Sequence, residues 1–185
     1  MKPLVGVSIA LALLTVPTIA CGQDSQTYLY DANGRLIAAT TARPTSGAYA
    51  SYALDDADNR TARNAYATTG PTVAGKLLSG ESLVPAQAIT NGSYTLTLQT
   101  SGDLVVTGSS GVVQHSCTGT GRSLYARMET NGNFVVRDVA GAILWQSNTG
   151  AYAGAELFLN SDGTLAVKSG GVTRWSGTVT GGGCF

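Results

Sequence analysis

Charged side chains are scarce and balanced in this sequence. Its 185 residues include 11 Lys and Arg, 11 Asp and Glu and a single histidine, so the formal net charge at neutral pH is zero. A nucleic-acid-binding surface needs a stripe of basic side chains, which this composition does not supply. We therefore expect no nucleic acid among the partners.

Helical patterning is also missing. Outside the N-terminus, no window repeats apolar residues at the helical period, and the chain is rich in glycine, threonine, serine and valine. Long charged helix formers are few, whereas β-branched residues favour strands. The sequence predicts an all-β protein.

Catalytic and cofactor motifs are the third absence. His115 lies in a glycine- and serine-rich stretch, which favours an exposed or structural side chain over a general base. The acidic run Asp55-Asp56-Ala57-Asp58 lacks the spacing and closing glutamate of a calcium loop, so a hairpin turn explains it better. No G-x-S-x-G element, zinc-ligand pattern or phosphate loop occurs. We predict no enzymatic activity, no cofactor and no metal site.

The one long apolar run marks a targeting segment. Lys2 precedes a predominantly apolar stretch, Leu4 to Ala20, which is too short and wrongly flanked for a transmembrane helix. We predict a signal peptide over residues 1–20. Residues 18–21 (TIAC) resemble a bacterial lipobox, which implies a lipid on Cys21 as the sole membrane anchor and a place in the cell envelope. Simple export and secretion are the alternative.

The cysteine count bears on the same question. Export implies an oxidising compartment, where an odd cysteine is conspicuous. If Cys21 carries lipid, Cys117 and Cys184 remain, and we predict a disulfide between them. Two unpaired thiols are the alternative.

Residues 21–72 contain two short segments that resemble each other. The segments YLYDANGRLIAATT (from Tyr28) and YALDDADNRTARN (from Tyr52) each place a turn signal between two β-prone runs, which is a hairpin signature. They resemble the YD repeats of the RHS family, in which many copies build large β shells. Two copies cannot close a shell, so we predict a short β-hairpin spacer.

Residues 73–185 contain three hairpins of one design, called here the first, second and third units. They read LTLQTSGDLVVT (96–107), ARMETNGNFVVR (126–137) and FLNSDGTLAVK (158–168). Gly132 follows Gly102 by 30 residues and Gly163 follows Gly132 by 31, a period typical of repeat architectures. A three-residue loop with a left-handed glycine would pair Gln99 with Asp103 in the first unit.

Strand alternation then assigns the two faces of each hairpin. The apolar face must be core. The inward positions are Leu96, Leu98, Leu104 and Val106 in the first unit, Ala126, Met128, Phe134 and Val136 in the second, and Leu157, Leu159, Leu165 and Val167 in the third. The outward positions form a small polar concavity floored by Val or Ala.

A further strand follows each hairpin and carries Trp145 in the second unit and Trp175 in the third. Tryptophans repeated at one position of each unit favour a shared core over sugar stacking. Gln114 stands at this position in the first unit, so we expect poorer packing there, for which a Cys117–Cys184 disulfide would compensate.

The stretches SGESL, GSYTLTLQ, TNGNFVVRD and ILWQSNTG together resemble the bulb-type lectin domain of the monocot mannose-binding lectins. The resemblance covers nearly all of about residues 73–182. It implies a β-prism II fold, in which three four-stranded antiparallel sheets surround a pseudo-threefold axis. It also implies one mannose site per unit, written Q-x-D-x-N-x-V-x-Y, whose polar residues bond sugar hydroxyls and whose valine touches the ring.

Each unit departs from that motif. The corresponding residues are Gln99, Ser101, Asp103, Val105 and Thr107 in the first unit, Glu129, Asn131, Asn133, Val135 and Arg137 in the second, and Asn160, Asp162, Thr164, Ala166 and Lys168 in the third. No unit retains the tyrosine. The second pocket is the best candidate because it keeps a polar cluster, although Glu129 and Arg137 could instead pair with each other.

We therefore predict an exported carbohydrate-binding module of a bacterial envelope, with mannose-type glycans as partners. The alternative is a structural, protein-interacting or self-assembling surface module that has lost sugar binding.

Overall fold

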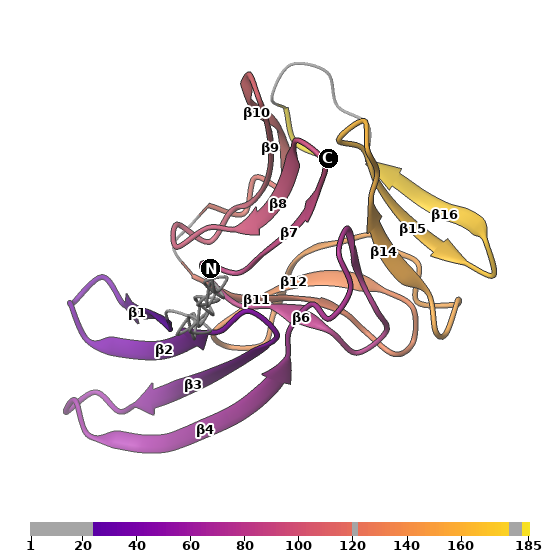
Figure 1. The fold of residues 1–185 in the computed structure, drawn as a ribbon. Helices are drawn as coiled ribbons and strands as arrows, with labels where there is room; N and C mark the ends of the chain where they lie inside the picture. Colours follow the sequence, from indigo (N-terminus) through magenta and orange to yellow (C-terminus); the bar gives the residue numbers. More distant parts are fainter. Residues whose placement is uncertain (1–23, 120–121, 178–182) are drawn as a thin grey trace, which may run out of the picture.

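The computed structural model describes residues 24–119, 122–177 and 183–185. Within these ranges the chain forms sixteen strands and no helix, and the strands make four antiparallel sheets of four strands each (Figure 1). None of the described residues thus forms a helix long and apolar enough to cross a membrane. The predicted signal peptide and Cys21 lie outside the described residues.

The N-terminal sheet contains β1 (Ser25–Tyr30), β2 (Leu36–Ala42), β3 (Ser46–Leu54) and β4 (Arg60–Thr69) in chain order. The two expected hairpins are present, and pairing between β2 and β3 joins them into one sheet. Three strands or more are needed for a stable isolated sheet, so this pairing explains how two short hairpins become ordered.

The turn between β1 and β2 and the turn between β3 and β4 are each built on an aspartate. Asp31 Oδ1 accepts the backbone N–H groups of Asn33 and Arg35, each at 2.9 Å. Asp55 Oδ1 accepts those of Ala57 (3.0 Å) and Asn59 (2.8 Å). Hydrogen bonds to the ionised form lower a carboxyl pKa, and the pKa of each aspartate lies below its ordinary value. The acidic run that begins at Asp55 therefore forms the hairpin turn between β3 and β4.

The remaining sheets form the three faces of the prism. The first prism sheet contains β7 (Ala88–Asn91), β8 (Tyr94–Leu98), β9 (Leu104–Gly108) and β10 (Gly111–His115). The second contains β11 (Ser123–Met128), β12 (Phe134–Asp138), β13 (Ile143–Gln146) and the distant β6 (Ser82–Leu83). The third contains β14 (Glu156–Leu159), β15 (Leu165–Ser169), β16 (Val172–Gly177) and the distant β5 (Lys76–Leu77). The predicted all-β prism is confirmed.

The hairpin register agrees with the prediction in all three units. The Gln99 N–H donates to the Asp103 carbonyl at 2.8 Å, and Gly102, with a φ of 87°, closes the loop onto Gln99. The same bonds recur in the second and third units. The twelve inward side chains are at most 1% exposed and form one shared core. Each hairpin buries its apolar face only against the other two, which explains the threefold arrangement.

An aromatic cluster fills one end of this core. The rings of Trp145 and Trp175 lie 5.2 Å apart, and Phe185 from the C-terminal tail lies 5.2 Å from Trp145 and 6.0 Å from Trp175. Gln114 takes the tryptophan position in the first unit, is 1% exposed and donates to the Gly163 carbonyl at 2.8 Å. Phe185 therefore supplies the third aromatic ring that the first unit lacks.

The Cys117–Cys184 disulfide fixes this tail. The prediction of that pairing is confirmed. His115 also bonds the tail through its backbone, which donates to Gly183 and accepts from Phe185. The bridge thus holds Phe185 in the aromatic cluster, which is the compensation expected at the first unit.

The N-terminal sheet packs against the second prism sheet (Figure 1). Leu29 and Ala38 form a buried cluster with Leu124, and the rings of Tyr49 and Tyr125 stack at 5.1 Å. Gln87 Nε2 donates to the carbonyl of Ser46 at 2.6 Å. The predicted spacer is therefore a sheet with its own contact to the prism.

Candidate functional site

The predicted concavity of each unit lies on the outer face of its prism sheet, around one central residue. The floors are Val105, Val135 and Ala166, which are 3%, 0% and 3% exposed. The neighbouring strand places one further side chain beside each floor, because His115 pairs with Val105, Gln146 with Val135 and Ser176 with Ala166. The alternation of a single hairpin did not reveal these three residues.

The first concavity is occupied by its own polar groups. Asp103 Oδ2 lies 2.6 Å from His115 Nδ1, and Asp103 Oδ1 accepts the Ser116 hydroxyl (2.9 Å) and the Thr118 N–H (3.0 Å). Gln99 and Ser101 lie at the exposed tip and bond each other at 3.3 Å. The aspartate is therefore committed to internal contacts, while Gln99 and Ser101 remain available to solvent.

The second concavity contains the expected polar cluster. Arg137 donates to Glu129 Oε1 from Nε (3.1 Å) and Nη2 (2.8 Å), and its Nη1 donates to the Gly141 carbonyl at 2.8 Å. Asn131 is exposed and its Nδ2 lies 3.4 Å from Glu129 Oε2. The side chains of Glu129 and Arg137 are 22% and 23% exposed. They pair across the strands, yet both still face solvent beside Asn131.

Asn133 has a structural role in the second concavity. It is 8% exposed, and its Oδ1 accepts the Ser147 hydroxyl (3.2 Å) and the Thr149 N–H (3.1 Å). Its Nδ2 donates to Gln146 Oε1 at 2.8 Å. Asn133 therefore fixes the loop after β13 as Asp103 fixes the loop after β10.

In the third concavity the polar side chains hydrogen-bond to one another. Asn160 Nδ2 donates to Thr164 Oγ1 at 2.9 Å, and Asp162 Oδ1 accepts both the N–H (2.9 Å) and the hydroxyl (2.7 Å) of Thr164. These bonds to the ionised carboxylate hold the pKa of Asp162 below its ordinary value. Lys168 lies over the Phe158 ring at 4.8 Å. The side chains bond one another and leave Asp162 exposed at the tip.

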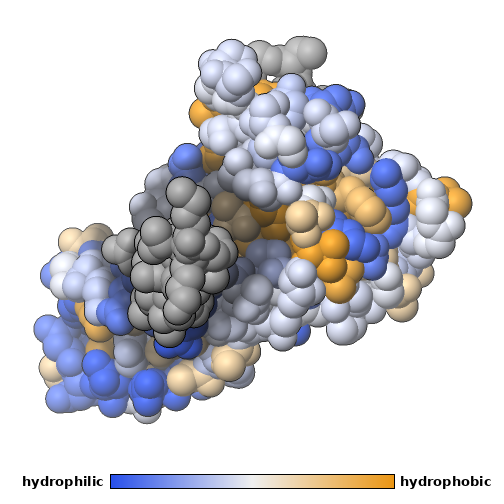
Figure 2. Space-filling model, viewed as in Figure 1, coloured by the Kyte–Doolittle hydropathy of each residue, from blue (hydrophilic) through white to orange (hydrophobic). Residues whose placement is uncertain are grey.

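Several hollows lie on or near the second prism sheet. One of about 260 Å³ is lined by Arg127, Glu129, Thr130 and Asn131, two of which belong to the second concavity. A larger one of about 760 Å³ lies between the N-terminal sheet and the second prism sheet, and its lining includes Tyr30, Tyr52 and Arg122. In Figure 2 apolar residues on the visible face gather on the prism, whereas the visible face of the N-terminal sheet is mostly hydrophilic. Two residues of the second concavity, Glu129 and Asn131, therefore line a hollow.

Comparison with known proteins identifies the scaffold. A mannose-specific lectin of Aloe arborescens is 36% identical over 95 residues, which cover 49% of this chain and 86% of that protein. The chain belongs to the mannose-specific lectin family. No protein-family model matches the sequence.

Solved structures agree with this lectin assignment at the level of the fold. A monomeric monocot mannose-binding lectin from Gastrodia elata matches with a TM-score of 0.52 at 21% identity, covering 58% of this chain and 99% of that one. A Marasmius oreades lectin matches with a TM-score of 0.52 at 21% identity, covering 57% and 91%. Neither match covers the whole chain. The remaining part is long enough to contain the N-terminal sheet.

Proposed function

We propose that this chain is an exported carbohydrate-binding module of a bacterial envelope that takes mannose-type glycans in its second concavity. One observation carries the proposal. Glu129 and Asn131 line a hollow of about 260 Å³, and Arg137, which pairs with Glu129 at 2.8 Å, keeps 23% of its side chain exposed. These three side chains offer a carboxylate acceptor, an amide and a guanidinium donor for the hydroxyl groups of a sugar.

The free energies of the available hydrogen bonds predict weak binding at a single site. A millimolar dissociation constant corresponds to about −4 kcal/mol, and a neutral hydrogen bond contributes about 0.5–1.5 kcal/mol net. Hydrogen bonds to charged groups contribute about 1.5–3 kcal/mol, so Glu129 and Arg137 can replace part of what the family's motif loses. A glycan must compete with the Glu129–Arg137 pair, and we expect measurable binding only when several copies are displayed together.

A glycan array with the multivalent protein tests this function. We expect mannose-terminated glycans to bind, and the variants Glu129→Ala and Arg137→Ala to lose the signal because each removes a rim partner. The matched control is Asn160→Ala in the third concavity, which should retain it. Asn133→Ala is less informative because it frees the loop held through Ser147 and Thr149. No signal from the wild type, or equal loss in the control, would contradict the proposal.

A restoration experiment sharpens the same test. The triple variant Glu129→Gln, Asn131→Asp and Arg137→Tyr recreates the family's motif around Asn133 and Val135. We expect it to bind mannose-terminated glycans more strongly than the wild type. An inactive triple variant that melts normally would show that the surrounding surface, and not the motif alone, prevents binding.

Export and lipidation complete the proposal. They rest on residues 1–20 and on Cys21, and mass spectrometry of the mature N-terminus distinguishes a lipid-modified Cys21 from simple cleavage. The segment at 21–72 resembles YD repeats, and we propose that it spaces the prism from its anchor.

A structural or self-assembling role is the second candidate, and β4 favours it. This ten-residue strand is the edge of the N-terminal sheet, and all of its residues except Thr68 are exposed. An unprotected edge can pair with another strand. A monodisperse monomer in light scattering, with no protein partner captured, would count against this role.

A further inference from the structure

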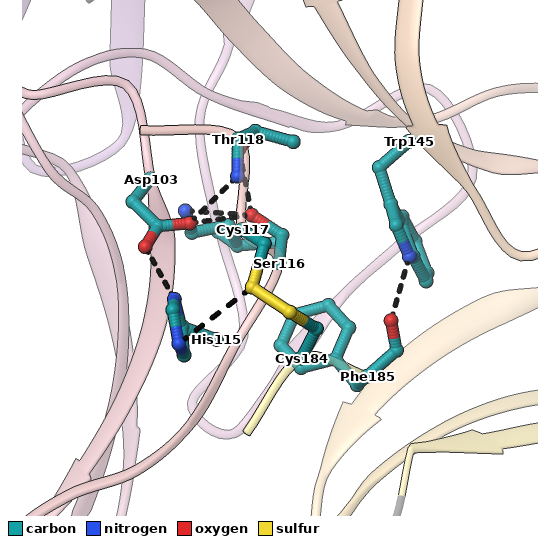
Figure 3. Close-up of a disulfide and its surroundings, with 9 residues drawn as sticks. Asp103, His115, Ser116, Cys117, Thr118, Trp145, Cys184 and Phe185 are labelled. Carbon is teal, nitrogen blue, oxygen red and sulfur yellow. Dashed lines mark hydrogen bonds and ion pairs between the residues drawn. A yellow bond between two sulfur atoms is a disulfide. The ribbon is translucent and has the colours of Figure 1, made fainter. Parts of the chain in front are cut away.

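The outer rim of the first unit holds a second cluster, made of Asp103, His115, Cys117 and Cys184 (Figure 3). Asp103 Oδ2 lies 2.6 Å from His115 Nδ1, and His115 Nε2 lies 3.7 Å from Cys117 Sγ. The ligand atoms of His115 and the two cysteines all lie within 4.8 Å of one another. An imidazole nitrogen therefore faces a disulfide while a carboxylate holds the other side of the ring.

The second unit has the same loop hydrogen bonds, called here the shared frame, but other side chains in place of the histidine and the cysteine. Ser116 Oγ accepts the N–H of Leu104 at the start of β9, and Ser147 Oγ accepts the N–H of Phe134 at the start of β12, each at 3.0 Å. Thr118 and Thr149 likewise donate to the carbonyls of Gly102 and Gly132. In this shared frame the second unit places Asn133, Gln146 and Asn148 where the first unit places Asp103, His115 and Cys117.

Cys117 occupies a backbone position that its residue type does not favour. Its φ is 56°, close to the 58° of Asn148 at the corresponding place. Asparagine tolerates the left-handed region better than most residues. A left-handed cysteine is therefore a local cost, and such outliers point toward function when the surrounding structure holds them in place.

We propose that reduction of the Cys117–Cys184 disulfide turns this cluster into a binding site for one zinc ion, with His115 Nε2 and the two thiolates as ligands. Tetrahedral zinc has Zn–N distances of about 2.0–2.1 Å and Zn–S distances of about 2.3 Å, so its N···S and S···S separations are about 3.6 and 3.8 Å. The observed Nε2···Sγ distance of 3.7 Å already matches the first of these. The two sulfur atoms must separate, and Cys184 Sγ, now within 4.8 Å of the histidine ligand atom, must settle at about 3.6 Å from Nε2.

Asp103 is the positioning residue of this site. A carboxylate on the far nitrogen of a zinc-bound histidine fixes the ring and its tautomer and makes it a better ligand. Asp103 is itself held by the Ser116 hydroxyl and the Thr118 N–H. The ring is therefore oriented before the metal arrives, with the lone pair of Nε2 directed at the sulfur atoms.

The chemical step balances with a dithiol as the reductant. Its thiolate attacks the exposed Cys184 Sγ, the S–S bond breaks, and Cys117 leaves as a thiolate beside His115. The second thiol of the reductant then displaces Cys184 and closes the reductant's own disulfide, so two electrons and two protons pass to the protein. Zinc displaces the two thiol protons to solvent, and a water fills the fourth position.

This site is separate from the proposed glycan site, because it lies on the first prism sheet and uses none of the second concavity's residues. The metal would also close the same chain loop as the disulfide. We therefore expect the zinc-bound tail to keep Phe185 against Trp145, where the Trp145 indole donates to the Phe185 carbonyl at 2.9 Å (Figure 3).

Cobalt is the probe for the test. The chain carrying Cys21→Ser is reduced with a dithiol, freed of reductant without oxygen and titrated with Co²⁺, then with Zn²⁺. We expect one equivalent of tetrahedral cobalt with thiolate-to-metal charge-transfer absorption, displaced by zinc. The oxidised protein should show no such absorption. A reduced protein without it would overturn the proposal.

The second unit supplies matched variants whose side chains the frame already accepts. His115→Gln and Cys117→Asn copy Gln146 and Asn148, and both should abolish the charge-transfer band or weaken cobalt binding more than 100-fold. Asp103→Asn copies Asn133 and should weaken metal binding about 10–100-fold while retaining the band. Binding by His115→Gln with wild-type affinity and spectrum would overturn the proposal, and the melting curves of the variants verify that they fold.

Discussion

At the scale of single residues, the three turn glycines share a sequence position but not an environment. Gly102, Gly132 and Gly163 all have φ between 85° and 94°, so any other residue there is strained. The space around them differs, however. A Cβ on Gly132 would lie 2.0 Å from the Tyr152 carbonyl oxygen, whereas a Cβ on Gly102 would lie no closer than 3.1 Å to Ser123. Gly132 in the second unit therefore tolerates a side chain less well than Gly102 in the first unit.

Gly132→Ala should be strongly destabilising. Left-handed strain alone costs about 1–2 kcal/mol, and the backbone clash with Tyr152 must also be relieved, so we expect a loss of about 3–5 kcal/mol in unfolding free energy. Denaturant unfolding measures it. Gly92→Ala is the matched control, because its φ is 60° and nothing lies within 4 Å. A control that loses as much as Gly132→Ala would contradict the argument from the clash.

At the scale of elements, the hairpins were predictable and their neighbours were not. The glycine period and the alternation of Leu96, Leu98, Leu104 and Val106 were enough to define β8, β9 and the core face. The two-residue strands β5 and β6 carry no such pattern, because they are defined by pairing with β14 and β11 far along the chain.

The residues beside each pocket floor could not be predicted for a related reason. Each third strand of a unit carries a register shift, located between Val112 and Gln114 in the first unit. A one-residue shift changes which face a side chain occupies. The sequence therefore placed Asp103 correctly on the outer face but left His115 unassigned, although the pair decides the chemistry of the first concavity.

The C-terminal tail acts as an element of the core, and Phe185→Ala tests that. Full truncation of a buried phenylalanine costs about 3–5 kcal/mol. Phe185 is half-buried, so we expect about 2 kcal/mol by the same scale. The loss exposes Trp145 and Trp175, and their fluorescence should shift to longer wavelength. Val172→Ala, on the exposed surface of β16, should change neither. Unchanged fluorescence in Phe185→Ala would contradict the aromatic substitution.

At the scale of the whole molecule, the N-terminal sheet and the prism meet through an aromatic contact as well as an aliphatic one. The Tyr49 ring lies between Tyr66 on its own sheet and Tyr125 on the prism, 5.1 Å from each. Burial in this junction raises the pKa of Tyr49 to about 12, and the neighbouring Tyr125 adds to the shift. The contact therefore prefers the neutral phenol.

That preference makes the contact sensitive to alkali in a defined direction. An unfolded tyrosine ionises near pH 10, whereas Tyr49 in the folded state ionises near 12. A raised folded-state pKa means that the stabilisation is complete below about pH 10 and is lost as the pH rises toward about 12. We expect the N-terminal sheet to release from the prism across that pH interval, which limited proteolysis of the connection between β4 and β5 detects.

The variant Tyr49→Phe tests the cause, because it keeps the ring and removes the ionisable group. Release of the N-terminal sheet in this variant should no longer follow the interval between about pH 10 and 12. Tyr28→Phe, at an exposed site, should behave as the wild type. Identical alkaline profiles for Tyr49→Phe and the wild type would show that another group controls the junction.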